Sequence, residues 1–273
     1  MTAESAANPL LRSERRKDHG LFGYLHSVES GAAGDGPGIR FVYFMSGCTF
    51  RCQYCHNPDT WKTKGGRKVT IEAALAEIKP YKNFLRFAGG VTVSGGEPMV
   101  QAKFVGELLR RIKETFGLHT ALDTQGVLHR AVQNDWLEPI DLVLLDVKHS
   151  SPEVHLKLTG QPLQPTIDFA QRLCRLKKRI WLRYVLVPGL TDEDRDILRL
   201  ADFAASLEGA VERVDVLPYH RMGMDKWKML GIPYLLEDVP TPTAESINHA
   251  LELFSSRGLK VNQEPNIAVG DCT

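Results

Sequence analysis

Six short apolar runs, separated by longer segments with helical periodicity, constrain the fold of this chain more than any other feature. The apolar runs lie at 39–45, 91–94, 119–123, 141–147, 180–187 and 211–217. They are nearly continuous in hydrophobic residues, which is typical of strands covered on both faces. Helical segments are expected at 70–81, 101–116, 165–178, 191–207 and 241–258. Alternation of this kind predicts a parallel sheet with outer helices.

Polar or glycine-rich segments follow these predicted strands. Six of them directly follow or close a strand: SGC, SGGEP, DTQG, DVK, VPGLTD and LPYH. Periodicity alone does not separate an open doubly wound sheet from a partial barrel. In both folds the functional residues collect at the carboxyl ends of the strands. We therefore expect one large cavity at that edge of the sheet.

The length and charge of the chain limit its class. A chain of 273 residues, 43% of them hydrophobic, can bury one sizeable core. We expect a single domain at 21–265, between a flexible polar leader at 1–20 and a tail at 266–273. The formal net charge of +1 gives no reason to expect nucleic acid or a membrane as partner. No apolar run approaches the roughly 18 residues that span a bilayer, and 1–20 lacks a secretory core, so we expect a cytoplasmic protein.

Three of the five cysteines lie close together. Cys48, Cys52 and Cys55 form a C-x3-C-x2-C pattern after the first predicted strand. An odd cysteine count without a signal peptide argues against a disulfide framework. Three thiolates on a four-iron cubane leave one iron open, where a substrate can bind and be reduced. Cys174 lies among helix-spaced apolar residues and is expected to be a small buried filler, whereas Cys272 near the end carries no argument.

Two other metal sites fit the same residues less well. Cys52 to His56 matches the C-x-x-C-H pattern of covalent haem attachment, but that chemistry belongs to exported proteins and leaves Cys48 unused. The three cysteines and His56 also match a zinc knuckle. Zinc knuckles usually lie in small loop-rich modules, so the pattern favours an open iron–sulfur site over both alternatives.

The motifs along the chain carry a resemblance that covers about Gly23 to Val261. In order they are GDGPGIRFVYFMSGCTFRCQYCHNPDTW, VTVSGGEPMVQ, LDTQG, DLVLLDVK, WLRYVLVPGLTD and VLPYHRMGMDKW. The chain resembles the radical S-adenosylmethionine (SAM) superfamily, and more narrowly the pyruvate formate-lyase activating enzymes. The resemblance implies an α/β fold of the partial (β/α)6 TIM-like barrel type. It also implies a [4Fe-4S] cluster held by Cys48, Cys52 and Cys55.

The resemblance also implies a set of SAM contacts. These are Tyr54, Cys55, His56, Ser94, Gly95, Gly96, Glu97, Asp146, Val147, Lys148 and His220. The residues themselves allow plainer interpretations. The SGGE segment lets backbone approach a ligand but also fits an ordinary turn, and Asp146 and Lys148 point to one face of a strand end that often only faces solvent. A histidine such as His56 or His220 is often only a surface or structural residue.

Two further sites follow from the resemblance. Asp123, Thr124 and Asp146 match positions that help to bind a monovalent cation near SAM, although Gln125 replaces the asparagine that is more frequent in the family. Asp35 and Arg183 match positions that face the glycine-bearing segment of the partner protein. The plain alternatives are a Gly/Pro turn residue for Asp35 and a pair with a neighbouring carboxylate for Arg183.

The implied function is that of an activase. Reductive cleavage of SAM gives a 5′-deoxyadenosyl radical, which removes a hydrogen from a backbone glycine of a glycyl radical enzyme. Residues 61–91 contain no cysteine-rich insert, which favours pyruvate formate-lyase, an enzyme of anaerobic glucose metabolism, as the partner. The alternatives are another glycyl radical enzyme, or a radical SAM reaction on a small molecule. A reductant such as flavodoxin and a monomeric state are also expected.

Overall fold

The computed structural model describes residues 21–262. The expected leader at 1–20, Cys272 and the tail at 266–273 lie outside the described residues. The strands are β1 (Phe22–Ala32), β2 (Ile39–Met45), β3 (Arg67–Thr70), β4 (Gly89–Gly95), β5 (Thr120–Thr124), β6 (Leu142–Asp146), β7 (Arg179–Leu186) and β8 (Val211–Pro218). The α-helices are α1 (Ile71–Ile78), α2 (Lys82–Ala88), α3 (Ala102–Phe116), α4 (Pro152–Thr159), α5 (Gln164–Arg175), α6 (Asp194–Ala205), α7 (Met224–Met229) and α8 (Ala244–Ser255).

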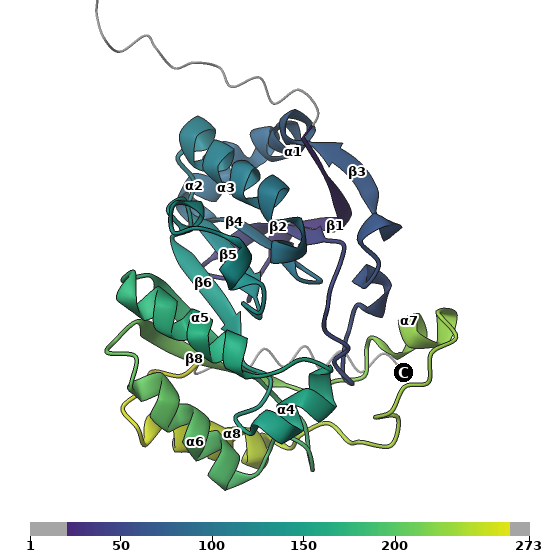
Figure 1. The fold of residues 1–273 in the computed structure, drawn as a ribbon, viewed down its shortest axis with the longest axis vertical. Helices are drawn as coiled ribbons and strands as arrows, with labels where there is room; N and C mark the ends of the chain where they lie inside the picture. The colour runs from purple at the N-terminus through teal and green to yellow at the C-terminus, as the bar shows by residue number, and fades with distance from the viewer. Residues whose placement is uncertain (1–20, 263–273) are drawn as a thin grey trace, which may run out of the picture.

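All the strands belong to one eight-stranded sheet in the order β3-β1-β2-β4-β5-β6-β7-β8. The six predicted runs are β2 and β4 to β8, and their mutual pairing is parallel. Within residues 21–262 the outer strands β3 and β8 do not pair with each other. Helices α3, α5 and α6 lie outside the curved sheet (Figure 1). The predicted parallel α/β fold with outer helices is confirmed.

The core explains why the apolar runs become strands. Every residue of β6 is buried, and one continuous hydrophobic cluster joins the sheet to its outer helices. Leu109 and Ile112 of α3 and Phe169 and Leu173 of α5 are fully buried in it. Burial of one such side chain stabilises the fold by about 1.5–3 kcal/mol. Helix and strand therefore form together, because neither can bury its apolar face alone.

Several elements were not predicted. The antiparallel strands β1 and β3 add to one edge of the parallel sheet, and α2, α4 and α7 lie in segments that were read as loop or left unassigned. In β1 most residues from His26 onward are exposed or half-buried, and in β3 only Val69 is buried. Neither strand therefore carries the continuous apolar pattern of a strand covered on both faces.

The expected start of the fourth helical segment at Thr191 is wrong. Helix α6 begins at Asp194. The Thr191 hydroxyl donates to the Val185 carbonyl and accepts from the Val187 amide, both at 2.7 Å. It is thus used to fix the turn after β7, so it is not available to cap the helix.

Two further predictions concern the ends of the last helix and the burial of Cys174. Thr243 caps α8, since its hydroxyl accepts from the Ser246 amide at 3.1 Å, and Gly258 follows the helix with a φ of +76°, which suits a helix end. Cys174 is half-buried against the core, and its thiol donates to the Leu207 carbonyl at 3.3 Å. It fills space as expected but is not fully buried.

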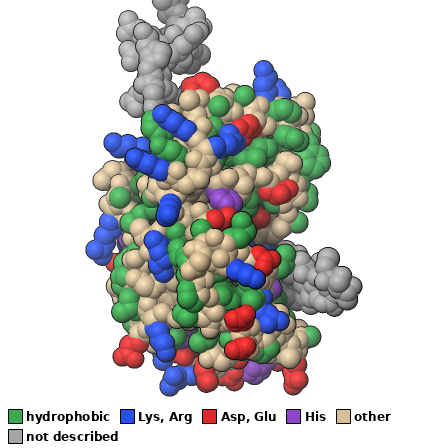
Figure 2. Space-filling view, turned by 90° about the vertical axis from the view of Figure 1, so that its right-hand side faces the viewer, with side chains coloured by type: hydrophobic (Ala, Val, Ile, Leu, Met, Phe, Trp, Pro, Cys, Tyr) green, Lys and Arg blue, Asp and Glu red, His purple; other side chains and the backbone are tan. Residues whose placement is uncertain are grey.

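The surface is of mixed charge. Lys and Arg alternate with Asp and Glu over the face that Figure 2 presents, and neither sign covers it. Among residues 21–262, no helix is both long and apolar enough to cross a membrane.

Candidate active site

A cavity of about 410 Å³ opens at the carboxyl ends of the parallel strands, within the volume range of small-molecule sites. Most of the predicted site residues line it: Asp35, Cys48, Cys52, Tyr54, Cys55, His56, Ser94, Gly95, Gly96, Asp123, Asp146, Lys148, Arg183 and His220. Glu97, Thr124 and Val147 are not among the lining residues. The structure therefore collects residues from six strand ends around one space, as the sequence predicted.

The three cysteines lie on the loop that follows β2, residues 46–57, which we call the cysteine loop. Backbone hydrogen bonds hold this loop from two sides. The Cys48 amide donates to the Trp61 carbonyl at 3.2 Å, and the Arg51 amide donates to the Thr159 carbonyl at the end of α4 at 2.7 Å. The loop thus has a fixed backbone without belonging to the sheet.

The cysteine thiols are unusually hard to ionise on their own. Burial raises the pKa of Cys48 to about 12, and it also raises the pKa values of Cys52 and Cys55. Lys148 is a cation that lowers all three of these pKa values. Three buried thiolates therefore need bound positive charge between them. Soft sulfur donors around one cavity fit an iron–sulfur cluster.

A single metal ion fits the same residues poorly. In the described part of the chain, no three His, Cys, Asp or Glu side chains are placed so that they could hold one ion. A zinc knuckle brings its four ligands onto one ion. A four-iron cluster is larger than one ion, so its thiolates stand further apart.

The glycines after β4 form a cradle next to the cysteine loop. Gly95 has a φ of +119°, and an added Cβ there would lie 2.1 Å from the Met45 amide nitrogen. A Cβ on Gly96 would lie 2.4 Å from the Gly47 carbonyl oxygen and 3.0 Å from the Cβ of Cys48. Only glycine fits this approach. The missing Cβ atoms therefore let residues 95–96 pack directly on Met45 and Gly47, and both glycines line the cavity beside Cys48.

The carboxylate of Glu97 is hydrogen-bonded within the protein. It is fully buried and accepts three hydrogen bonds, from the Thr124 hydroxyl (2.7 Å), the Met99 amide (3.0 Å) and the Gln125 amide (3.0 Å). Burial raises the pKa of Glu97 to about 7, although these donors lower it. The side chain joins the loops after β4 and β5 and does not face the cavity.

Thr124 and Val147 also point away from the cavity. The Thr124 hydroxyl is used by Glu97 and by the Gly126 amide, and the Val147 side chain is fully buried in the core. Successive side chains of a strand face opposite sides, so Asp123 and Thr124 cannot both face the cavity. The Thr124 hydroxyl is thus not placed beside Asp146.

Five charged side chains meet inside the cavity. Lys148 Nζ lies 2.9 Å from Asp146 Oδ2, as expected for residues two apart at a strand end. Arg183 Nη1 lies 3.1 Å from Asp123 Oδ2 and 3.9 Å from Asp35 Oδ1. Burial raises the pKa of Asp123 to about 6, while Arg183 lowers it. Three carboxylates against two cations leave a net negative charge, which favours a cationic ligand.

Polar atoms without partners also face this region. Asp123 Oδ1, Gln125 Oε1, Arg183 Nε and the Tyr54 hydroxyl are buried, and each lacks a hydrogen-bond partner within the described residues. Buried polar groups are normally paired. This concentration of unpaired groups at one cavity indicates that a polar ligand completes them. Gln125, noted in the sequence only as a departure from the family pattern, is one of the lining residues.

Two histidines close the other side of the cavity. The rings of His56 and His220 are stacked with centroids 4.0 Å apart, and His56 Nε2 donates to the His220 carbonyl at 3.1 Å. Burial lowers the pKa of His56 to about 4 and also lowers that of His220. Both rings are therefore neutral at pH 7, and a flat neutral surface suits stacking with a heteroaromatic ring.

Sequence reasoning missed the contacts around Trp61 and Trp227. The Trp227 indole N–H donates to the Cys55 carbonyl at 2.7 Å, and Trp61 lines the cavity beside Cys55. Both tryptophans end motifs that carry the resemblance, CHNPDTW and GMDKW. A buried tryptophan usually finds a partner for its indole N–H, but the sequence does not show which group that partner is.

Comparisons with known proteins give matches that cover most of the chain. The model of the radical SAM superfamily matches residues 42–201. The chain is 44% identical over 246 residues to a pyruvate formate-lyase-activating enzyme of Staphylococcus epidermidis, covering 87% of this chain and 97% of that protein. It is 45% identical to that of Staphylococcus aureus over the same shares.

Solved structures are similar in fold. A domain of a pyruvate-formate lyase-activating enzyme from Bacteroides vulgatus superposes with a TM-score of 0.53 at 24% identity, over 64% of this chain and 98% of that one. Streptococcus suis SuiB bound to S-adenosylmethionine gives a TM-score of 0.62 at 15% identity, over 82% of this chain and 49% of that one. A radical SAM methyltransferase from Sphaerobacter thermophilus gives 0.60 at 17% identity, over 82% and 65%.

Proposed function

Since the chain belongs to the radical SAM superfamily and, within it, to the family of pyruvate formate-lyase-activating enzymes, we propose that it activates pyruvate formate-lyase by generating the glycyl radical of that enzyme. Membership implies two cofactors, SAM and a [4Fe-4S] cluster. The observation that carries the proposal is the placement of the cysteines. Three thiols, one buried and two half-buried, line the same cavity as the glycine cradle and the Asp146–Lys148 pair.

When bound, the cluster supplies the electron that cleaves SAM into methionine and the 5′-deoxyadenosyl radical that takes the glycine hydrogen. The protein supplies position and exclusion of water. Cys48, Cys52 and Cys55 are the cluster ligands in this proposal. Their partial burial supports a site in which stray hydrogen donors do not reach the radical.

The SAM contacts follow from the same cavity. Gly95 and Gly96 line the cavity, and in this proposal their backbone contacts the methionyl end of SAM, while the absence of a Cβ lets them pack directly on the end of β2 and the segment after it. Lys148 supplies a cation to the anionic or ribose groups of SAM. The neutral stacked rings of His56 and His220 supply a flat surface for its adenine. The remaining predicted contacts of Glu97 and Val147 are limited to backbone atoms in this proposal, because their side chains face away.

A monovalent cation and the partner segment complete the proposal. Asp123 and Asp146 offer carboxylate oxygens to the cation, while Thr124 offers only its backbone carbonyl. Asp35 and Arg183 face the glycine-bearing segment of pyruvate formate-lyase. We further infer a monomeric cytoplasmic protein with a reductant such as flavodoxin, which the family resemblance supports.

The test is an anaerobic reconstitution with iron and sulfide, followed by a reductant, SAM and pyruvate formate-lyase. We expect about four irons per chain and a glycyl doublet in the electron paramagnetic resonance (EPR) spectrum that needs both SAM and the lyase. Cys52→Ala removes the cluster and the doublet, whereas the matched control Cys174→Ala keeps both.

Three results would change or end the assignment. SAM cleavage that a metabolite drives without any protein partner would favour a radical SAM enzyme acting on a small molecule. A doublet with a different glycyl radical enzyme, and none with pyruvate formate-lyase, would move the chain to another activase branch. A colourless protein that holds zinc would end the proposal.

A further inference from the structure

The segment after β8, residues 219–230 including α7, contacts the cysteine loop directly. The indole N–H of Trp227 donates to the Cys55 carbonyl at 2.7 Å, and Trp227 is only 4% exposed. Its ring packs edge-on against Trp61 and Tyr234, with centroids 5.2 and 5.3 Å apart. Indole nitrogen can only donate, so this bond fixes which way the Cys55 carbonyl points.

A second contact of α7 joins three parts of the chain. Lys226 Nζ lies 2.6 Å from Asn57 Oδ1 and 3.4 Å from Asp59 Oδ2. The same Asp59 oxygen lies 2.7 Å from His26 Nε2 on β1. The first strand, the end of the cysteine loop and α7 are therefore held in one polar network.

A third contact lies at His56. Gly223 packs so closely that an added Cβ would lie 2.7 Å from the Cα of His56. The His56 ring is stacked on His220 at the start of the same segment. Both Cys55 and the residue that follows it are thus placed by the 219–230 segment.

These contacts matter because the sheet does not close. In residues 21–262, β3 and β8 are the two outermost strands of the sheet and do not pair with each other, so no strand pairing joins the first parallel strand to the last. The loops after β2 and β8 instead meet through Trp227, Lys226 and Gly223. Cys55 therefore depends on the position of α7.

We propose that Trp227 is a positioning residue, whose hydrogen bond to the Cys55 carbonyl sets where Cys55 and His56 stand relative to the cluster and SAM. The inference rests on the proposed function, since it takes Cys55 as a cluster ligand. Loss of the bond leaves a buried carbonyl without its donor. Small displacements of this kind lower the affinity for a ligand that needs several groups in register.

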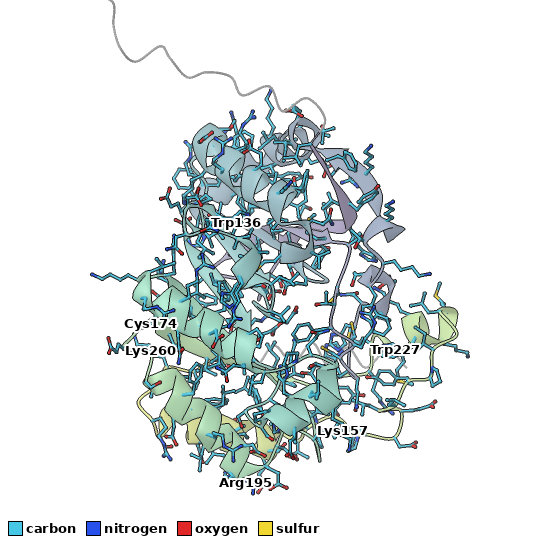
Figure 3. The ribbon with its side chains drawn as sticks, in the orientation of Figure 1. Trp136, Lys157, Cys174, Arg195, Trp227 and Lys260 are labelled. Atoms are coloured by element: carbon cyan, nitrogen blue, oxygen red, sulfur yellow. The ribbon has the colours of Figure 1, made fainter. Side chains whose placement is uncertain are left out.

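The chain offers a matched control. Trp136 donates its indole N–H to the Ala102 carbonyl, also at 2.7 Å, and Figure 3 shows it well apart from Trp227. Trp227→Phe and Trp136→Phe each remove one indole–carbonyl bond and keep an aromatic ring. Both should lower the thermal midpoint of unfolding by a similar amount. Only Trp227→Phe should alter the site.

The measurement is an EPR titration of the reduced, reconstituted protein with SAM, together with the iron content per chain. We expect the SAM concentration at half of the spectral change to rise about fivefold in Trp227→Phe, the effect of one ordinary hydrogen bond. It should stay unchanged in Trp136→Phe. Loss of iron from a folded Trp227→Phe protein, with iron retained in Trp136→Phe, also supports the inference.

If the wild type and Trp227→Phe have the same iron content and the same SAM concentration at half of the spectral change, the inference is overturned. If Trp227→Phe does not fold, Lys226→Met decides, because it breaks the contact to Asn57 and keeps Trp227. A rise in the SAM midpoint of about twofold supports the role of α7, and no change contradicts it. A wild-type protein that binds no cluster would instead refute the proposed function.

Discussion

Arg183 Nη1 lies 3.1 Å from Asp123 Oδ2, deep in the cavity, and both side chains are almost buried. The sequence predicted these two residues for different sites, Arg183 for the partner segment and Asp123 for a cation. The structure joins them, and Asp35 lies 3.9 Å from the same guanidinium nitrogen. The proposed cation and partner sites therefore share one network of charges.

Removal of Arg183 should destabilise the protein strongly. Arg183→Met leaves Asp123 buried beside Asp146 without its cation, and breaking a buried pair costs about 3 kcal/mol of unfolding free energy. Denaturant unfolding of the wild type and variant measures this loss. The double variant Arg183→Met/Asp123→Asn should recover part of it, because position 123 then carries no unpaired charge. If the loss of unfolding free energy in the double variant equals the sum of the losses in the two single variants, the two side chains are not coupled.

Glu97→Gln should also lower stability although it changes one atom. The carboxylate accepts hydrogen bonds on both oxygens, from Thr124 and Met99 on one and from Gln125 on the other. An amide group would place its NH₂ against a donor, at an expected cost of about 2–3 kcal/mol. Thermal unfolding measures this loss, and Glu114→Gln is the control. Glu114 forms an exposed ion pair with Arg110, so its replacement should lower the free energy of unfolding by less than about 1 kcal/mol. Similar losses in both would contradict the role given to Glu97.

Gly96→Ala should damage the site more than the fold. The added Cβ would lie 2.4 Å from the Gly47 carbonyl oxygen, so the cysteine loop must move. A displacement of the loop by about 1 Å should lower the rate of reductive SAM cleavage by about 10²-fold. The control is Gly117→Ala, where φ is +62° and the Cβ meets nothing. Gly117→Ala should lower the free energy of unfolding by about 1 kcal/mol and leave the rate of SAM cleavage unchanged. A wild-type rate of SAM cleavage in Gly96→Ala as well would contradict the role given to the glycine cradle.

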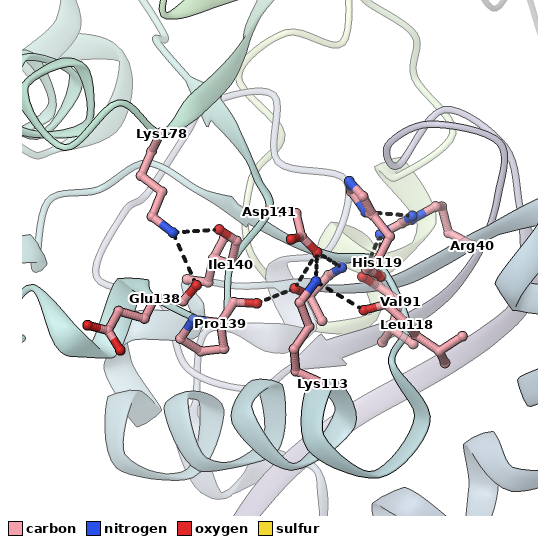
Figure 4. A network of polar contacts seen from close by, with 11 residues as sticks. Arg40, Val91, Lys113, Leu118, His119, Glu138, Pro139, Ile140, Asp141 and Lys178 are labelled. Atoms are coloured by element: carbon pink, nitrogen blue, oxygen red, sulfur yellow. Dashed lines mark hydrogen bonds and ion pairs between the residues drawn. The ribbon is translucent and has the colours of Figure 1, made fainter.

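His119 predicts a pH dependence of stability. Burial lowers the pKa of His119 to about 4, and Arg40, Lys113 and Arg179 lower it further while Asp141 raises it. Figure 4 shows His119 beside Arg40, which donates to His119 Nδ1 at 3.2 Å. The unfolded chain, with a histidine pKa near 6.5, binds more protons between pH 6.5 and 4. This part of the stability is therefore complete above about pH 6.5 and is lost as the pH falls towards 4.

The variant His119→Asn tests this relationship, since its side-chain oxygen can still accept from Arg40. The loss of unfolding free energy between pH 7 and 4.5 should be smaller in the variant by about 1–2 kcal/mol, a value reduced for the partial exposure of the ring. Equal pH slopes for the two proteins would assign the acid sensitivity to other groups.

The sequence predicted the fold where side-chain patterns are simple. All six parallel strands were found because burial on both faces requires continuous apolar residues. Strands β1 and β3 were missed because most of their residues are exposed or half-buried. Strand β1 is placed by pairing with β2, and β3 by pairing with β1, and no local pattern records these pairings.

The sequence predicted which residues lie near the site more reliably than it predicted which way their side chains point. The cysteines, the glycines at 95–96 and the Asp146–Lys148 pair face the cavity as expected. The side chains of Glu97 and Thr124, both predicted as ligand contacts, bond to each other, so only their backbone atoms remain for the predicted contacts. Motif resemblance does not state which way a side chain points. Trp227 was missed because its partner, a backbone carbonyl about 170 positions away, leaves no signal in the local sequence.

The central claim is that Cys48, Cys52 and Cys55 hold a four-iron cluster with one iron free for SAM. Electron–nuclear double resonance on the reduced protein tests this directly, with SAM carrying ¹⁵N in its amino group and ¹⁷O in its carboxylate. We expect hyperfine coupling of both labels to the cluster. Absence of both couplings, with a protein side chain as the fourth ligand while SAM is present, would contradict it.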